Sequence, residues 1–122
     1  MSAGVVRVER PAAEVAAAAR RAGATVGVLP AVTDRRSLFR QVGSALRFPG
    51  YYGRNLDALE ECVRDLSWLP PGEVVLVWED DAALLAVEPA THRAVLEILT
   101  DAAAESASGP RPLRVLLAPP AT

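Results

Sequence analysis

The chain has 122 residues, 51% of them hydrophobic, with no lysine and a formal net charge of −2, a composition that excludes disorder and fits one domain with a modest core. The only cysteine, Cys62, excludes an internal disulfide and gives no sign of an oxidising compartment. Neither a membrane-spanning run of about 20 apolar residues nor a signal-peptide pattern occurs, so we expect a cytoplasmic protein without membrane contact.

The first part of the chain alternates strand-like and helix-like segments. Residues 5–8 form a short β-rich run, and Pro11 is well placed as the first residue of an alanine-rich helix that ends at Gly23. Residues 24–29 then indicate a second strand. This strand–helix–strand start predicts that the two strands are parallel neighbours, because a crossover helix joins parallel strands.

Two helices follow, separated by a loop over residues 48–54. The first is capped by Thr33 or Asp34 and should run to about Leu46. The second should run from Asn55 to about Leu66. Apolar residues recur in both at the helical period and predict one buried face each, formed by Leu38, Val42 and Ala45 or Leu46 in the first and by Leu56, Leu59, Val63 and Leu66 in the second.

The rest of the chain adds two strands and two helices. The run 74–78 is continuously apolar, which is typical of a strand covered on both faces. A short helical turn over 82–87, a longer helix from Pro89 to about Ser106 and a strand over 113–117 complete the pattern. The alternation predicts an α/β fold with a small, mostly parallel sheet of three to four strands flanked by helices.

Charge is distributed unevenly along the sequence. Residues 55–105 contain twelve Asp or Glu and two Arg, a net charge of −10, whereas residues 1–54 carry +6 and residues 106–122 carry +2. Gathered on one face, the acidic block would attract basic partners and speed their association. Alternatively, these charges solvate separate helix faces and cancel locally.

The sequence gives little support to catalysis, and we expect no catalytic residue, metal or cofactor. His92 is the only histidine and is expected to be a solvated helix residue, while Cys62 is expected to be a partly buried structural thiol. Metal sites and nucleophilic triads need more partners than these. Asp80 and Asp81 follow a strand as in a receiver domain, but that site requires a lysine. Glycine-rich phosphate loops are absent, and the acidic half would repel nucleic acid.

The sequence Tyr51-Tyr52-Gly53-Arg54-Asn55 leads directly into the acidic helix. We expect one tyrosine to pack inward and the other to face solvent, Gly53 to adopt a positive φ, and Asn55 to cap the helix. An exposed aromatic beside carboxylates is typical of an interface anchor. The alternative is a packed loop in front of a solvated helix, in which Glu60 pairs with Arg64.

Residues 51–59, together with Cys62, closely resemble the loop and second helix of the barstar family, small intracellular inhibitors of secreted ribonucleases. Val77-Trp78 resembles part of the strand that follows this helix in the family, and residues 95–102 resemble the family's long penultimate helix. The resemblance spans about residues 24–118. It implies one barstar-like domain over residues 1–122, in which residues 1–23 are an N-terminal strand–helix addition.

The resemblance also implies how such a protein works. Barstar-like proteins plug the ribonuclease cleft and substitute carboxylates for the RNA phosphates, so Tyr51 would pack on the catalytic site. Asp57 and Glu61 would meet the basic groove, and Asp101 would reach it from the neighbouring helix. The partner-binding residues implied in this way are Tyr51, Tyr52, Gly53, Asn55, Asp57, Ala58, Glu60, Glu61 and Asp101. The resemblance implies a basic microbial ribonuclease as the partner, and we expect the free inhibitor to be a monomer.

Some positions depart from the family pattern. Glu61 stands at the family's most important aspartate and is one methylene longer. Glu60 replaces a tryptophan, and Asp65-Leu66 replaces a Gly-Trp pair. Two alternatives therefore remain open: an interaction module of the same fold with a different partner, and a small α/β enzyme, which would need a pocket with a perturbed titrating pair.

Overall fold

The computed structural model describes residues 4–121 and contains one sheet of four parallel strands. The strands are β1 (Val5–Arg7), β2 (Thr25–Leu29), β3 (Val74–Glu79) and β4 (Leu113–Ala118), in the spatial order β1-β4-β3-β2. The expected α/β class and the parallel sheet are confirmed. Observed helix and strand boundaries lie within two residues of the predicted ones, and α5 has the predicted bounds.

The two N-terminal strands are not neighbours, so that prediction is wrong. β1 pairs with β4 and β2 pairs with β3, which places β1 and β2 at opposite edges of the sheet. The reason is burial: every residue from Val74 to Trp78 is buried, as is most of β4, and these two strands therefore occupy the centre. The three-residue β1 and the half-buried β2 lie outside them.

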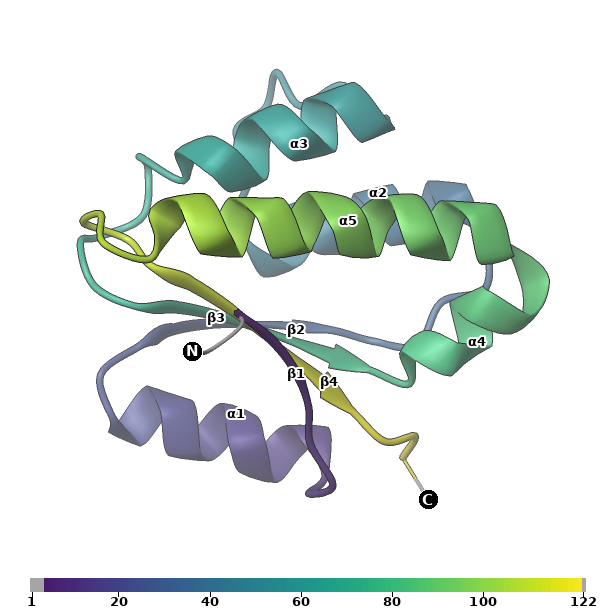
Figure 1. Cartoon of the computed structure of the whole chain (residues 1–122), viewed down its shortest axis with the longest axis horizontal. Helices are drawn as coiled ribbons and strands as arrows, with labels where there is room; N and C mark the ends of the chain where they lie inside the picture. Colours follow the sequence, from purple (N-terminus) through teal and green to yellow (C-terminus); the bar gives the residue numbers. More distant parts are fainter. Residues whose placement is uncertain (1–3, 122) are drawn as a thin grey trace.

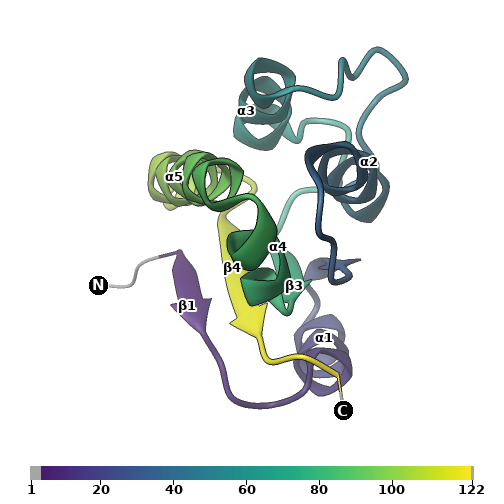
Figure 2. The same cartoon turned by 90° about the vertical axis from the view of Figure 1, so that its right-hand side faces the viewer.

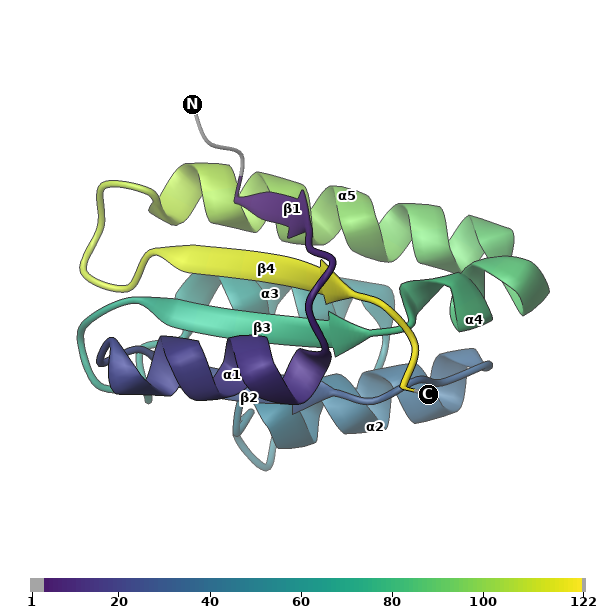
Figure 3. The same cartoon turned by 90° about the horizontal axis from the view of Figure 1, so that it is seen from below.

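Helices cover both faces of the sheet unequally. Helix α1 (Ala12–Arg21) lies alone on one face and runs beneath β2 and β3 (Figure 1, Figure 3). Its alanine-rich inner side allows close packing on Val75, Val77 and Leu116. It ends before Gly23, whose φ of +97° provides the turn expected there.

On the other face, α2 (Arg35–Ala45) and α5 (Pro89–Ser106) pack on the sheet. Helix α3 (Leu56–Asp65) lies over them, further from the strands, and forms the outermost layer (Figure 2). The short α4 (Asp81–Val87) follows β3 directly and packs on α5. The apolar stripes predicted for α2 and α3 point into the core; Leu38, Val42, Leu46, Leu59, Val63 and Leu66 are buried.

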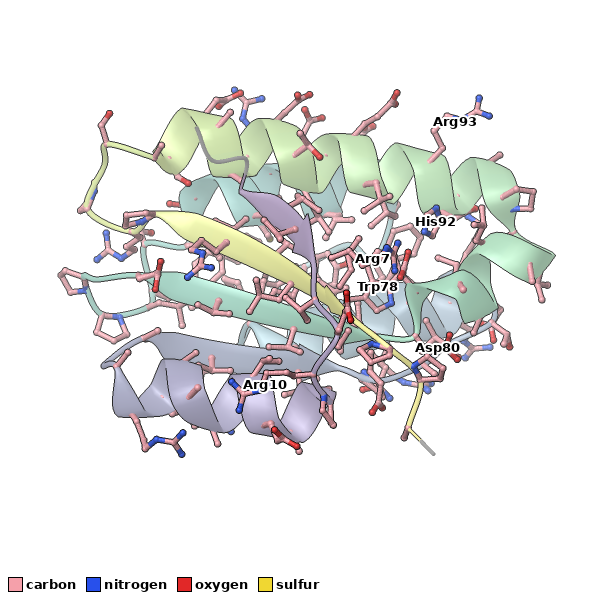
Figure 4. All side chains as sticks on the ribbon, turned by 60° about the horizontal axis from the view of Figure 1, so that its bottom comes forward. Arg7, Arg10, Trp78, Asp80, His92 and Arg93 are labelled. Carbon is pink, nitrogen blue, oxygen red and sulfur yellow. The ribbon has the colours of Figure 1, made fainter. Side chains whose placement is uncertain are left out.

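A buried carboxylate connects three elements. Asp81, only 1% exposed, accepts hydrogen bonds from Nη1 and Nη2 of Arg7 at 3.0 and 3.2 Å. It also lies 2.7 Å from Nε2 of His92, whose ring packs against Trp78 with centroids 5.6 Å apart. Figure 4 shows Arg7, Trp78 and His92 close together although they come from β1, β3 and α5.

This network corrects the expectation for His92. The side chain is only 6% exposed and is not a solvated helix residue. The sequence places it in the first turn of α5, but α4 folds back against that turn and delivers Asp81 to the ring. A buried carboxylate needs such partners, because an unpaired one would lose its hydration without compensation.

We predict that Asp81→Ala lowers the free energy of unfolding by about 2–3 kcal/mol, because it removes the buried partner of both His92 and Arg7, the last residue of the edge strand β1. Chemical denaturation at pH 7 measures this. Arg10→Ala breaks the exposed Arg10–Glu14 pair and should cost less than about 0.5 kcal/mol. Equal effects of the two substitutions would contradict a structural role for the buried pair.

The same carboxylate predicts an acid limit of stability. Burial by itself would raise the pKa of Asp81, but the hydrogen bonds from Arg7 and His92 outweigh it, and the pKa lies below its ordinary value. Asp81 therefore binds protons more weakly in the folded than in the unfolded protein, so its stabilisation is complete above about pH 4 and is lost as the pH falls through the folded-state pKa. Denaturation between pH 2 and 6 should show a steeper acid loss for the native protein than for Asp81→Asn.

Candidate protein-binding surface

An aromatic cluster fixes the loop between α2 and α3. The ring of Tyr52 meets Phe48 edge-on with centroids 4.7 Å apart, and Phe48 meets Trp68 in the same way at 5.7 Å. Trp68 donates from Nε1 to the carbonyl oxygen of Leu46 at 3.0 Å. Tyr52 thus packs inward while Tyr51 is 72% exposed, as expected for this pair.

Close packing against α2 explains why the inward tyrosine fits. A Cβ atom at Gly43 would lie 3.0 Å from the Tyr52 ring, so only glycine allows this approach without displacement. The Tyr52 hydroxyl is buried and has no hydrogen-bond partner among the described residues. Burial, followed by the nearby Cys62, raises the pKa of Tyr52 to about 12.

The entry into α3 differs from the prediction in one residue. Arg54, not Gly53, adopts the positive φ, at +57°. At Gly53 a Cβ would lie 3.3 Å from Nδ2 of Asn55, a tight contact that requires the Asn55 side chain to shift by a few tenths of an ångström. That amide turns back toward the Gly53 carbonyl at 3.4 Å, while Oδ1 accepts from the N–H of Ala58 at 2.8 Å. Asn55 is therefore the N-cap, as expected.

Beyond the cap, α3 and α5 form a surface that we call the acidic groove. It is a hollow of about 520 Å³ with five carboxylates and one guanidinium in its lining, a net charge of −4. Its members are Asp57, Glu60, Glu61, Arg64, Asp65 and Glu105. Arg64 lies 3.5 Å from Glu60 and 3.0 Å from Glu105, and so links the two helices.

The structure brings together most of the expected binding residues but not all. Asp57, Glu60 and Glu61 line the acidic groove, and Ala58 is half-buried behind Asn55. Asp101 is exposed on α5 but lines a separate hollow of about 580 Å³, together with His92 and other residues of α4 and α5. Glu105, one turn further along α5, is the residue of that helix that lines the acidic groove.

A family model described as "Barstar (barnase inhibitor)" matches residues 27–118 of this chain. The chain belongs to the barstar family. Its members are inhibitors rather than enzymes, and the α/β fold with a parallel sheet is the one that this membership implies. A search of curated proteins found no match.

The barstar match begins at residue 27, whereas the sequence indicated a start at 24. It therefore leaves out β1, α1 and the first residues of β2. Of the N-terminal addition expected over residues 1–23, residues 1–3 lie outside the part of the chain that the structure describes. The remainder is built into the barstar sheet through β1 and covers it through α1.

The acidic block of residues 55–105 does not gather all its charge at the acidic groove. Asp81 is buried and paired with Arg7 and His92. Glu73 lies 3.6 Å from Arg114 on the neighbouring strand. Only five of the twelve carboxylates line the groove, so the two alternatives for the block each hold for part of it.

Within the described residues, no group of three or more His, Cys, Asp or Glu is arranged to hold a metal ion. Nor does any described helix have the length and apolar character to cross a bilayer. Cys62 is buried, and its burial, then the carboxylates of Glu61 and Asp65, raise the pKa of the thiol. A thiol held protonated is a poor nucleophile, which agrees with the structural role expected for it.

We predict that Tyr52 resists ionisation. In a Tyr51→Phe variant, absorbance titration should show the remaining tyrosine ionising near pH 12 in the folded protein. In denaturant the same group should ionise near its ordinary value of about 10. Because the folded protein holds this proton more tightly, its stability should fall as the pH rises from about 10 toward 12. Ionisation near pH 10 under native conditions would mean that the loop opens freely.

Proposed function

We propose that this protein is a stoichiometric inhibitor that occupies the active-site cleft of a basic secreted or toxin ribonuclease of the barnase-like, guanyl-specific kind. The observation that carries the proposal is the acidic groove on the outermost helix layer, beside an exposed Tyr51. A ribonuclease binds a polyanion, so its cleft is basic, and a carboxylate surface can replace the RNA phosphates. Made in the cytoplasm as a monomer without a cofactor, such an inhibitor protects its host.

Ion pairing within the groove divides the carboxylates into two kinds. Arg64 pairs with Glu60 and Glu105, which neutralises part of the charge. Among the described residues, Asp57, Glu61 and Asp65 form no ion pair and are exposed. These three carboxylates are available to basic side chains of the partner. In the proposed complex, Asp57 and Glu61 carry the electrostatic part of recognition, and Tyr51 packs on the catalytic site.

The surface is also organised in advance. Asn55 caps α3, the apolar stripe of α3 fixes the helix over α2 and α5, and the aromatic cluster fixes the preceding loop. A binding surface that is already ordered loses little conformational freedom when the complex forms. Tyr52, Gly53 and Ala58 support the proposed surface from behind, by packing and by the cap.

The direct experiment is titration of guanyl-specific microbial ribonucleases with this protein while RNA cleavage is monitored. Cleavage should stop near a one-to-one ratio. If no enzyme of a broad panel is inhibited, the inhibitor proposal is wrong. The native protein and the Asp57→Ala variant can then both be used to capture partners from the native host. A partner other than a ribonuclease that binds the native protein but not the variant would favour an interaction module of the barstar fold.

We predict that Asp57→Ala and Glu61→Ala each weaken the ribonuclease complex by about 2 kcal/mol or more, because each leaves a basic group of the enzyme buried without its partner. Calorimetry or inhibition constants measure this loss. Glu14→Ala on α1, across the sheet from the groove, should change the affinity by less than about 0.5 kcal/mol (Figure 1). Equal losses in all three variants would place the interface elsewhere.

The charge of the groove also predicts electrostatic steering. At low salt the on-rate should exceed the unsteered ~10⁵–10⁶ M⁻¹s⁻¹ by one or two decades. It should fall as the Debye length shortens to about 8 Å near physiological salt, while the off-rate changes far less. Stopped-flow binding at several salt concentrations measures both. An on-rate that does not depend on salt would show that the groove does not direct association.

A further inference from the structure

A second charged surface lies on the other side of the Tyr51–Asn55 loop. Residues 35–54 contain five arginines and no Asp or Glu. All five are exposed, and in the described part of the chain none of them forms an ion pair. They are Arg35, Arg36, Arg40, Arg47 and Arg54. Protein surfaces ordinarily carry charges of both signs side by side, so a cluster of arginines without carboxylates indicates a surface for an acidic partner.

Two adjoining hollows are lined by four of these arginines, three on α2 and Arg54 in the loop before α3. One, of about 460 Å³, is lined by Arg35, Arg36, Phe39, Arg40, Arg54 and Asn55. The other, of about 280 Å³, runs from Arg40 and Gly43 to the loop at Phe48, Gly50, Tyr52 and Arg54. Arg40 and Arg54 line both, so the two hollows form one continuous surface, which we call the basic groove. Neither lining contains a carboxylate.

The positive charge of the basic groove is largely not neutralised by nearby carboxylates. Asp34 is the closest along the chain, and its carboxylate accepts from the N–H and hydroxyl of Ser37 at the start of α2. These hydrogen bonds, and then the charge of Arg40, lower the pKa of Asp34. Asp57, in the first turn of α3, lines the acidic groove and not the basic one.

The two grooves are adjacent along the chain, on either side of the start of α3. Arg54 and Asn55 line the basic groove, and α3 with its carboxylates begins at the next residue. A protein seated on Tyr51 and the acidic groove therefore comes within reach of Arg40 and Arg54. A cleft rim that is basic throughout would be repelled there, since like charges brought together at an interface disfavour binding.

From this arrangement we infer that the ribonuclease bound by this chain carries carboxylates along the rim of its basic cleft, and that these carboxylates lie in the basic groove. The inference rests on the proposed inhibitor function and adds its selectivity. The acidic groove recognises the cleft that ribonucleases share, whereas Arg40 and Arg54 distinguish among enzymes by the charge beside that cleft. Guanidinium forks suit this task because they bind carboxylates through two parallel hydrogen bonds.

The test compares two charge-reversed proteins with the same net charge. One carries Arg40→Glu and Arg54→Glu in the basic groove. The control carries Arg20→Glu and Arg21→Glu, exposed arginines at the end of α1 on the opposite face of the sheet (Figure 1). Each is titrated against two guanyl-specific ribonucleases, one with carboxylates at its cleft rim and one whose rim is basic throughout. Circular dichroism confirms that both variants fold.

The expected effect changes sign with the enzyme. The groove variant should lose about tenfold or more in affinity for the enzyme with an acidic rim, and gain about tenfold for the enzyme with a basic rim. The control should shift both affinities by the same small factor, because it changes only net charge. A groove variant that behaves like the control would overturn the inference and leave the inhibitor function intact.

Two other results would also be decisive. If neither the native protein nor the groove variant inhibits any ribonuclease of the panel, the proposed function fails and the inference fails with it. A single-stranded RNA decamer gives the second result. If the native protein binds this decamer and the Arg40→Glu, Arg54→Glu variant does not, while enzyme affinities stay unchanged, the basic groove is a nucleic-acid site and the inference is wrong.

Discussion

The need to cover two strands on both faces determines the rest of this structure. β3 and β4 are almost wholly apolar, so they lie in the centre of the sheet and require helices above and below. Helix α1 covers one face, and α2 with α5 covers the other. This leaves no strand for α3 to cover, and its apolar stripe packs on the helices instead. The surface that we propose for binding is carried by α3, the helix that packs on other helices and not on the sheet.

Sequence order then places opposite charges on neighbouring surfaces. The arginines precede the Tyr51–Asn55 loop and the carboxylates follow it, so a single turn of the chain separates the basic from the acidic groove. Packing of Tyr52 against Gly43 and Phe48 holds that turn in place. In the proposed complex, recognition depends on this boundary between charges as well as on either charge alone, and the aromatic cluster fixes the position of the boundary.

Local features of the fold could be predicted from the sequence, and long-range ones could not. The helical period located the buried faces of α2 and α3, and the Asn55 cap followed from its position before α3. The pattern does not record which strands are neighbours, so the wrong pairing was predicted for β1. The burial of His92 depends on Asp81, eleven residues away, and the place of Glu105 in the acidic groove depends on how α5 crosses α3. Periodicity along one element carries no information about such crossings.

The short strand β1 also has a consequence for solubility. Without it, β4 would present an unpaired backbone edge, which is a template for pairing with another chain. β1 satisfies that edge over only three residues and ends at Arg7, whose side chain is 62% exposed. A strand so short, with a charge at its end, offers little backbone for further addition. The N-terminal segment that the barstar match leaves out thus covers most of the edge of β4 that could otherwise pair with another chain, and offers only a short edge in its place.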